Sequence, residues 1–69
     1  MSHGHENLYL NNIERKIITL IIEGKNNKEI AGLIGLSVGT VKNYVSNLLQ
    51  KYDFKNRMEL AIYFIREEK

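Results

Sequence analysis

The 69-residue sequence contains no cysteine, no proline and no tryptophan. Without cysteine the chain can form neither a disulfide framework nor a thiolate metal site, and a reducing compartment is favoured. No apolar run approaches the roughly 18 residues of a membrane-spanning helix, since the longest, Ile17–Ile22, is interrupted by Thr19. The N-terminus also lacks the succession of basic, apolar and small residues that marks a signal peptide. We therefore expect a cytoplasmic protein without membrane contact.

Catalytic motifs are absent as well. A chain of this length forms one domain at most and buries only about 60% of its unfolded surface, which excludes a large catalytic fold with a deep cleft. No carboxylate pair, Ser/His/Asp set or glycine-rich phosphate loop has a spacing that catalysis uses. The histidines, His3 and His5, stand together near the N-terminus, where an irregular end is favoured over a weak metal site. We expect no enzyme, no metal and no cofactor.

The charge is small overall but unevenly distributed. The net charge is +2, while the segment from residue 25 to residue 57 carries six cations and two anions, and thus +4. No acidic residue lies between Val38 and Gln50. Chance clustering on a solvated surface and a surface that meets a polyanion, most simply nucleic acid, both fit this pattern. Charge alone leaves the two interpretations open.

Apolar spacing and capping residues predict an all-α chain of four helices in residues 10–69, preceded by an irregular segment, residues 1–9. Three asparagines can each cap a helix with a glutamate three residues later, in the pairs Asn11 and Glu14, Asn26 and Glu29, and Asn56 and Glu59. Ser37 can cap the third helix, about 38–52, and Gly24 and Gly35 can end the first two. The expected inward positions are Ile13, Ile17, Ile18, Leu20, Ile21, Ile30, Ala31, Leu33, Ile34, Val38, Val41, Val45, Leu48, Leu49, Tyr52, Leu60, Ala61, Phe64 and Ile65.

The second and third helices, joined by a short turn with glycine, have the order of a helix-turn-helix. The outer face of the third helix carries only small, amide, hydroxyl or cationic residues, which suits major-groove readout. The candidate base-reading residues are Lys42, Asn43, Ser46 and Gly39. The candidate phosphate contacts are Asn27, Lys28, Thr40, Tyr44, Asn47 and Lys51. For Tyr44 a place in the core is the alternative, and for Lys42 a contact to phosphate alone.

The segments Gly24–Ala31, Leu36-Ser37 and Thr40–Leu48, followed by Lys51-Tyr52 and Asn56-Arg57, resemble the LuxR-type helix-turn-helix, also called the GerE-like or NarL/FixJ effector domain. The resemblance covers residue 10 to about residue 65. It implies a four-helix domain that binds promoter DNA as a dimer, with the third helix as recognition helix. It also implies RNA polymerase as a further partner. Where the family has Leu-Gly after the lysine at the end of the third helix, this chain has Tyr52-Asp53.

The resemblance further implies a dimer contact through the fourth helix. Its outward residues are expected to be Met58, Glu59, Ile62, Tyr63 and Arg66. A homodimer of this kind would bind an inverted repeat, and DNA would help to hold a weak pair together. The chain would be either a stand-alone regulator or the effector domain of a response regulator. The alternative function is a helical protein-interaction module that keeps the scaffold without DNA affinity.

Overall fold

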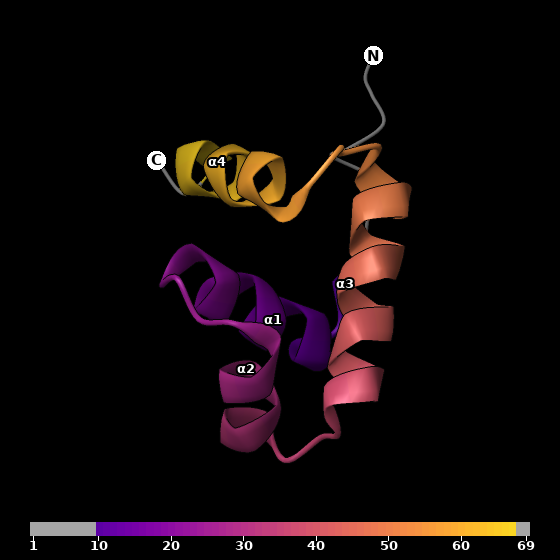
Figure 1. Ribbon diagram of the computed structural model, residues 1–69. Coiled ribbons are helices and arrows are strands. Elements are labelled where there is room, and N and C mark those ends of the chain that lie inside the picture. Colours follow the sequence, from indigo (N-terminus) through magenta and orange to yellow (C-terminus); the bar gives the residue numbers. More distant parts are fainter. Residues whose placement is uncertain (1–9, 68–69) are drawn as a thin grey trace.

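In a computed structural model of the protein, the described residues are 10–67, and they form four helices and no strand. The helices are α1 (Asn12–Ile22), α2 (Asn27–Ile34), α3 (Val38–Tyr52) and α4 (Arg57–Glu67), shown in Figure 1. The predicted all-α, four-helix architecture is confirmed over this range. The irregular segment expected at residues 1–9, with its two histidines, lies outside the described residues.

Two predicted capping boxes begin the first two helices. Asn11 Oδ1 accepts from Glu14 N at 2.8 Å while Glu14 Oε1 accepts from Asn11 N at 2.9 Å. Asn26 and Glu29 repeat this exchange at the start of α2, with the same two distances. Because each exchange satisfies two backbone N–H groups that a helix start leaves unpaired, the sequence itself defines where α1 and α2 begin.

The start of α4 differs from the prediction. Asn56 Oδ1 accepts from Glu59 N at 3.0 Å, as expected for a cap. The Glu59 carboxylate, however, accepts from Lys55 N at 2.7 Å, one residue earlier than a capping box requires. The third predicted box is therefore only half formed, because the backbone entering α4 presents the N–H of Lys55 to the glutamate.

Left-handed residues end the first three helices. Gly24 and Gly35 have φ of 88° and 76°, so both predicted stops are confirmed. Asp53 ends α3 with φ of 61°, at the place where the LuxR-type pattern has glycine. An aspartate in this region costs about 1 kcal/mol relative to glycine, although its short polar side chain makes it one of the residues that tolerate it.

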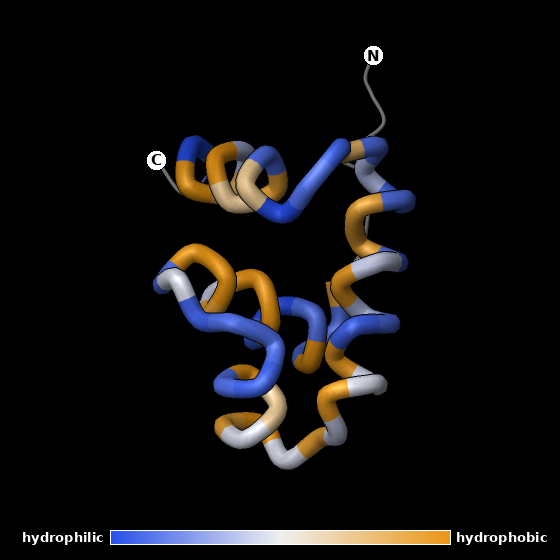
Figure 2. The backbone as a smooth tube through the Cα atoms, in the orientation of Figure 1, coloured by the Kyte–Doolittle hydropathy of each residue, from blue (hydrophilic) through white to orange (hydrophobic). Residues whose placement is uncertain are grey.

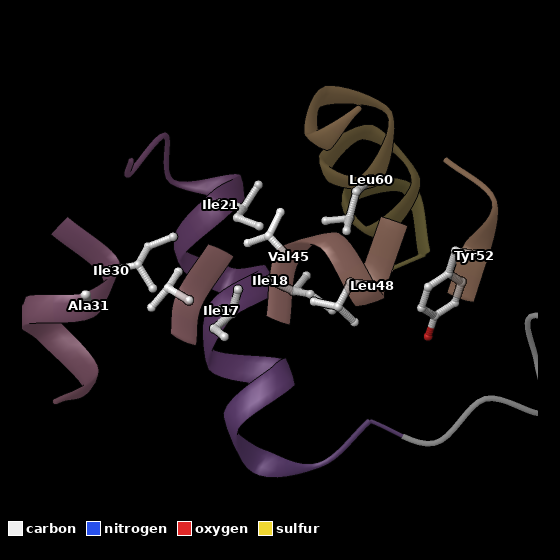
Figure 3. Packing of buried hydrophobic residues seen from close by; sticks show 10 residues of the cluster. Ile17, Ile18, Ile21, Ile30, Ala31, Val45, Leu48, Tyr52 and Leu60 are labelled. Atoms are coloured by element: carbon white, nitrogen blue, oxygen red, sulfur yellow. The ribbon is translucent and has the colours of Figure 1, made fainter. Parts of the chain in front are cut away.

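The core is built around α1 and α3, each of which contacts the other three helices. Side chains from all four helices meet in this core, as Figure 3 shows. Hydrophobic segments of α3 face the other helices in Figure 2, and its hydrophilic segments face outward. The buried residues are Ile17, Ile18, Ile21, Ile30, Ala31, Val41, Val45, Leu48, Tyr52 and Leu60.

Four residues that the helical period places inward are exposed. Ile13 and Val38 are 37% and 42% exposed, each near the start of its helix, where no neighbouring helix covers them. Leu33 is 62% exposed, and the buried residues of the short helix α2 are Ile30 and Ala31. Ile65 is 42% exposed. The helical period thus placed most inward residues correctly, and its errors are these four.

An aromatic cluster closes the corner between the end of α3 and α4. Tyr52 lies 5.6 Å from Phe54 and 5.2 Å from Phe64, measured between ring centroids. Tyr63 lies 5.5 Å from Phe54 and 5.0 Å from Phe64. Burial, followed by the nearby Tyr63, raises the pKa of the Tyr52 hydroxyl above its ordinary value, which favours its neutral form. Tyr63, which was expected to point largely outward, is half-buried because its ring packs into this cluster.

Within residues 10–67, no helix combines the length and the apolar composition that crossing a membrane requires. In the same range, no three His, Asp or Glu side chains come together in a way that could hold a metal ion.

Candidate nucleic-acid interface

The turn between α2 and α3 is fixed by backbone hydrogen bonds. The N–H groups of Gly35 and Leu36 both donate to Ala31 O, at 2.9 and 3.0 Å. Ser37 Oγ then accepts from Thr40 N at 3.1 Å and begins α3. Because α2 packs against α3, this short turn holds the two helices as one unit, in the order of a helix-turn-helix.

The outer face of α3 is exposed and free of acidic residues over its 15-residue length. Val41, Val45 and Leu48 hold the opposite side in the core. All four candidate base-reading residues are exposed on this face, namely Gly39, Lys42, Asn43 and Ser46. The structure therefore brings together cationic, amide and hydroxyl donors on a rigid helix, with no carboxylate on that helix to repel an anion.

The candidate phosphate contacts are less uniform. Lys28 and Asn47 are exposed, whereas Thr40, Tyr44 and Asn27 are half-buried. Thr40 Oγ1 accepts from Ser37 Oγ at 2.8 Å. Tyr44 packs against the core cluster, so the alternative considered for its ring is partly realised. These half-buried side chains can meet a phosphate only through their polar tips.

Lys51 has an intramolecular partner. Its Nζ lies 3.7 Å from Glu14 Oε2, and its side chain is 32% exposed. The Glu14 side chain is only 15% exposed, so the pair is partly buried. The contact places the Lys51 ammonium against a carboxylate of α1.

Gly39 has no intramolecular reason to be glycine. A Cβ atom built at this position meets nothing within 4 Å, and the backbone there is helical. Gly32, in the middle of α2, has equally open surroundings. Glycine weakens a helix by about 0.5–1 kcal/mol relative to alanine, so its presence on the outer face of α3 fits a surface that another molecule approaches closely.

The second candidate surface lies on α4. Met58, Ile62 and Ile65 are 68%, 46% and 42% exposed. At 100° per residue they fall within about 60° of one another around the helix, opposite Leu60. We call these three residues the α4 stripe. Sequence reasoning found Met58 and Ile62 but missed Ile65, which replaces Tyr63 as an outward apolar residue.

Sequence reasoning also missed the role of Arg57. Its Nη1 donates to Asn27 Oδ1 at 2.6 Å, and its Nη2 donates to the backbone oxygen of Lys25 at 2.9 Å. The first residue of α4 thus holds the start of α2, 30 positions away in the sequence. One signal was available: a cation in the first turn of a helix is disfavoured by the helix dipole, so an arginine there needs a partner elsewhere.

Comparison with known proteins identifies a family and several relatives that match most of this chain. Residues 9–64 match the family described as bacterial regulatory proteins, luxR family. The chain is 46% identical over 46 residues to the transcriptional regulatory protein DesR of Bacillus subtilis, covering 67% of this chain and 23% of DesR. It is 46% identical over 59 residues to the probable transcriptional regulator ycf29 of Porphyra purpurea, covering 86% and 28% of the two chains.

A further relative is the transcriptional regulatory protein LiaR of Bacillus subtilis, 41% identical over 59 residues, or 86% of this chain and 27% of LiaR. The chain thus spans about a quarter of the length of the curated relatives it matches.

Proposed function

The chain belongs to the luxR family of bacterial regulatory proteins, and we propose that it is a sequence-specific DNA-binding unit of a transcription regulator. The observation that carries the proposal is the exposed, acid-free outer face of α3, held rigidly by α2 and the core. The names of the relatives, all transcriptional regulators, support the same role. The binding unit comprises residues 10–69 and acts in the cytoplasm.

In this proposal α3 enters the major groove of promoter DNA as the recognition helix. Lys42 lies one turn into α3, where its ammonium can reach guanine O6 and N7. Asn43 and Ser46 follow on the same exposed face, and Gly39 lets the backbone come close to the base edges. Around this centre the phosphate contacts are Asn27, Lys28, Thr40, Tyr44, Asn47 and Lys51.

We further propose a homodimer through α4. The α4 stripe supplies apolar area, and Glu59 and Arg66 are exposed on the same helix. Tyr63, also expected at this contact, is half-buried in the aromatic cluster on another side of α4. A two-fold contact would pair each helix with its copy and set two recognition helices about 34 Å apart on an inverted repeat. RNA polymerase is proposed as a further partner, and only the family resemblance supports it.

A salt titration tests the function directly. If the chain binds duplex DNA through phosphates, the logarithm of the binding constant falls linearly with the logarithm of the salt concentration. Lys28→Ala and Lys51→Ala should each weaken all duplexes about evenly and lower that slope by about one. The exposed Lys16, on α1, provides the control: Lys16→Ala should keep the slope of the original protein.

The competing function, a helical protein-interaction module, predicts that no salt-dependent duplex binding is observed. If both lysine variants kept the original slope while the domain still bound DNA, these two lysines would have to be removed from the interface.

The substitution Gly39→Ala is expected to change the stability of the domain and its affinity for DNA in opposite directions. The new methyl group meets nothing in the chain and improves helix propensity, so thermal unfolding should show a gain of up to about 0.5–1 kcal/mol. Affinity for a specific duplex should fall, because the methyl group occupies the space of close approach. Gly32→Ala is the matched control, with the same gain in stability and unchanged affinity. Equal affinity in both variants would show that Gly39 does not face DNA.

A further inference from the structure

We propose that Arg57 is a positioning residue that turns the Asn27 amide so that its Nδ2 donor faces DNA phosphate; this rests on the proposed function. An arginine guanidinium has donors and no acceptor. The amide atom 2.6 Å from Arg57 Nη1 is therefore the oxygen, Oδ1. Oδ1 and Nδ2 share one carbon, so fixing the oxygen toward Arg57 directs the NH₂ group to another side.

The orientation of the Asn27 amide matters because phosphate oxygens only accept hydrogen bonds. An Asn27 amide in the opposite orientation would present Oδ1 and repel them. Asn27 is the first residue of α2, where backbone N–H groups also favour an anion. Within residues 10–67, Asn27 Nδ2 has no hydrogen-bond partner of its own, so the donor remains available for a ligand.

Arg57 can impose this orientation because it is anchored independently. Its Nη2 donates to the backbone oxygen of Lys25 at 2.9 Å, in the loop that precedes α2. The two terminal nitrogens of the planar guanidinium therefore have separate tasks: Nη2 is bound to the backbone, and Nη1 holds the Asn27 amide. A lysine keeps the charge at this position but lacks the fork, so it would leave the amide to rotate.

The arrangement also joins the two proposed surfaces. Arg57 is the first residue of α4 and directly precedes Met58 of the α4 stripe. Its hydrogen bonds tie that helix to the start of α2, which Figure 1 shows as a separate element on the other side of α1. A dimer formed through α4 would thus hold the phosphate-contacting end of α2 in a fixed place relative to the two-fold axis.

The test compares binding of single and double variants to one duplex and to random duplexes. Arg57→Lys should lower affinity about two- to tenfold on both, the loss of one hydrogen bond, with the salt slope unchanged because the charge is retained. Asn27→Ala should show a similar loss. The double variant should lose little more than Asn27→Ala alone, since the effect of Arg57 that passes through the Asn27 amide is already lost in that variant. Arg15→Lys, an exposed arginine on α1, is the control.

The variant Asn27→Asp shows whether a loss of affinity comes from the missing donor or from a disturbed fold. The carboxylate still accepts from Arg57, so circular dichroism should show intact helices and an unchanged or higher melting temperature. Because the donor is gone, affinity should fall at least as far as in Asn27→Ala. Additive losses in the double variant, or an Asn27→Asp variant that binds as well as the original, would overturn the positioning role. If the unaltered chain bound no duplex at all, the proposed function itself would fail, which is a separate result.

Discussion

Replacing Lys42 with alanine is expected to weaken binding to a specific site by about 1–3 kcal/mol and to relax the preference at one base position. Lys42 is exposed on the acid-free face of α3, one turn from the Ser37 cap. In the absence of a carboxylate on its helix, no neighbour on that face competes for its ammonium. A long donor at this position reaches the two acceptors of guanine in the major groove.

The loss should be measured by selecting bound duplexes from a random pool with the original and the altered chain. Selection with the original chain gives the half-site, its spacing and its symmetry, and selection with Lys42→Ala shows which position becomes degenerate. Lys16→Ala serves again as the control for removing one exposed cation outside the proposed interface. A loss that is equal on specific and random duplexes would mean that Lys42 contacts only phosphate.

Most of the fold could be predicted from local sequence signals, namely the residues that begin and end helices. The helix starts at Asn11, Asn26 and Ser37 and the stops at Gly24 and Gly35 depend on residues within a few positions of one another. Such features are readable from sequence because caps and left-handed stops are set by local backbone chemistry. The outer face of α3 was readable for the same reason: once its apolar arc is known, the remaining positions must be outside.

What sequence did not reveal depends on which element packs against which. Tyr63 is half-buried because the ring of Phe54, between α3 and α4, packs against it, and Ile65 is exposed instead of buried. The bond from Arg57 to Asn27 joins residues 30 positions apart, and no periodicity encodes it. The exposure of the base-reading candidates on α3 was thus predictable, whereas the contacts that orient side chains such as Asn27 were not.

Ile62→Glu is expected to leave the domain folded but to abolish cooperative binding to a duplex with two half-sites. Ile62 is 46% exposed, so a glutamate there remains solvated in the monomer. In the proposed dimer it would be buried without a partner, and burial of an unpaired charge is strongly unfavourable. Leu33→Glu is the control, because Leu33 is 62% exposed on α2, away from the α4 stripe.

A charge-swap experiment makes this prediction specific for a two-fold contact. Ile62 stands between Met58 and Ile65 in the α4 stripe, so in a symmetric pairing it lies closest to its own copy. Ile62→Glu and Ile62→Lys should each bind the two-half-site duplex without cooperativity, since like charges then face each other. An equal mixture of the two variants should recover cooperativity through mixed dimers. Retained cooperativity in a folded Ile62→Glu variant would place the dimer contact elsewhere, and failure of the mixture would show that Ile62 does not meet its copy.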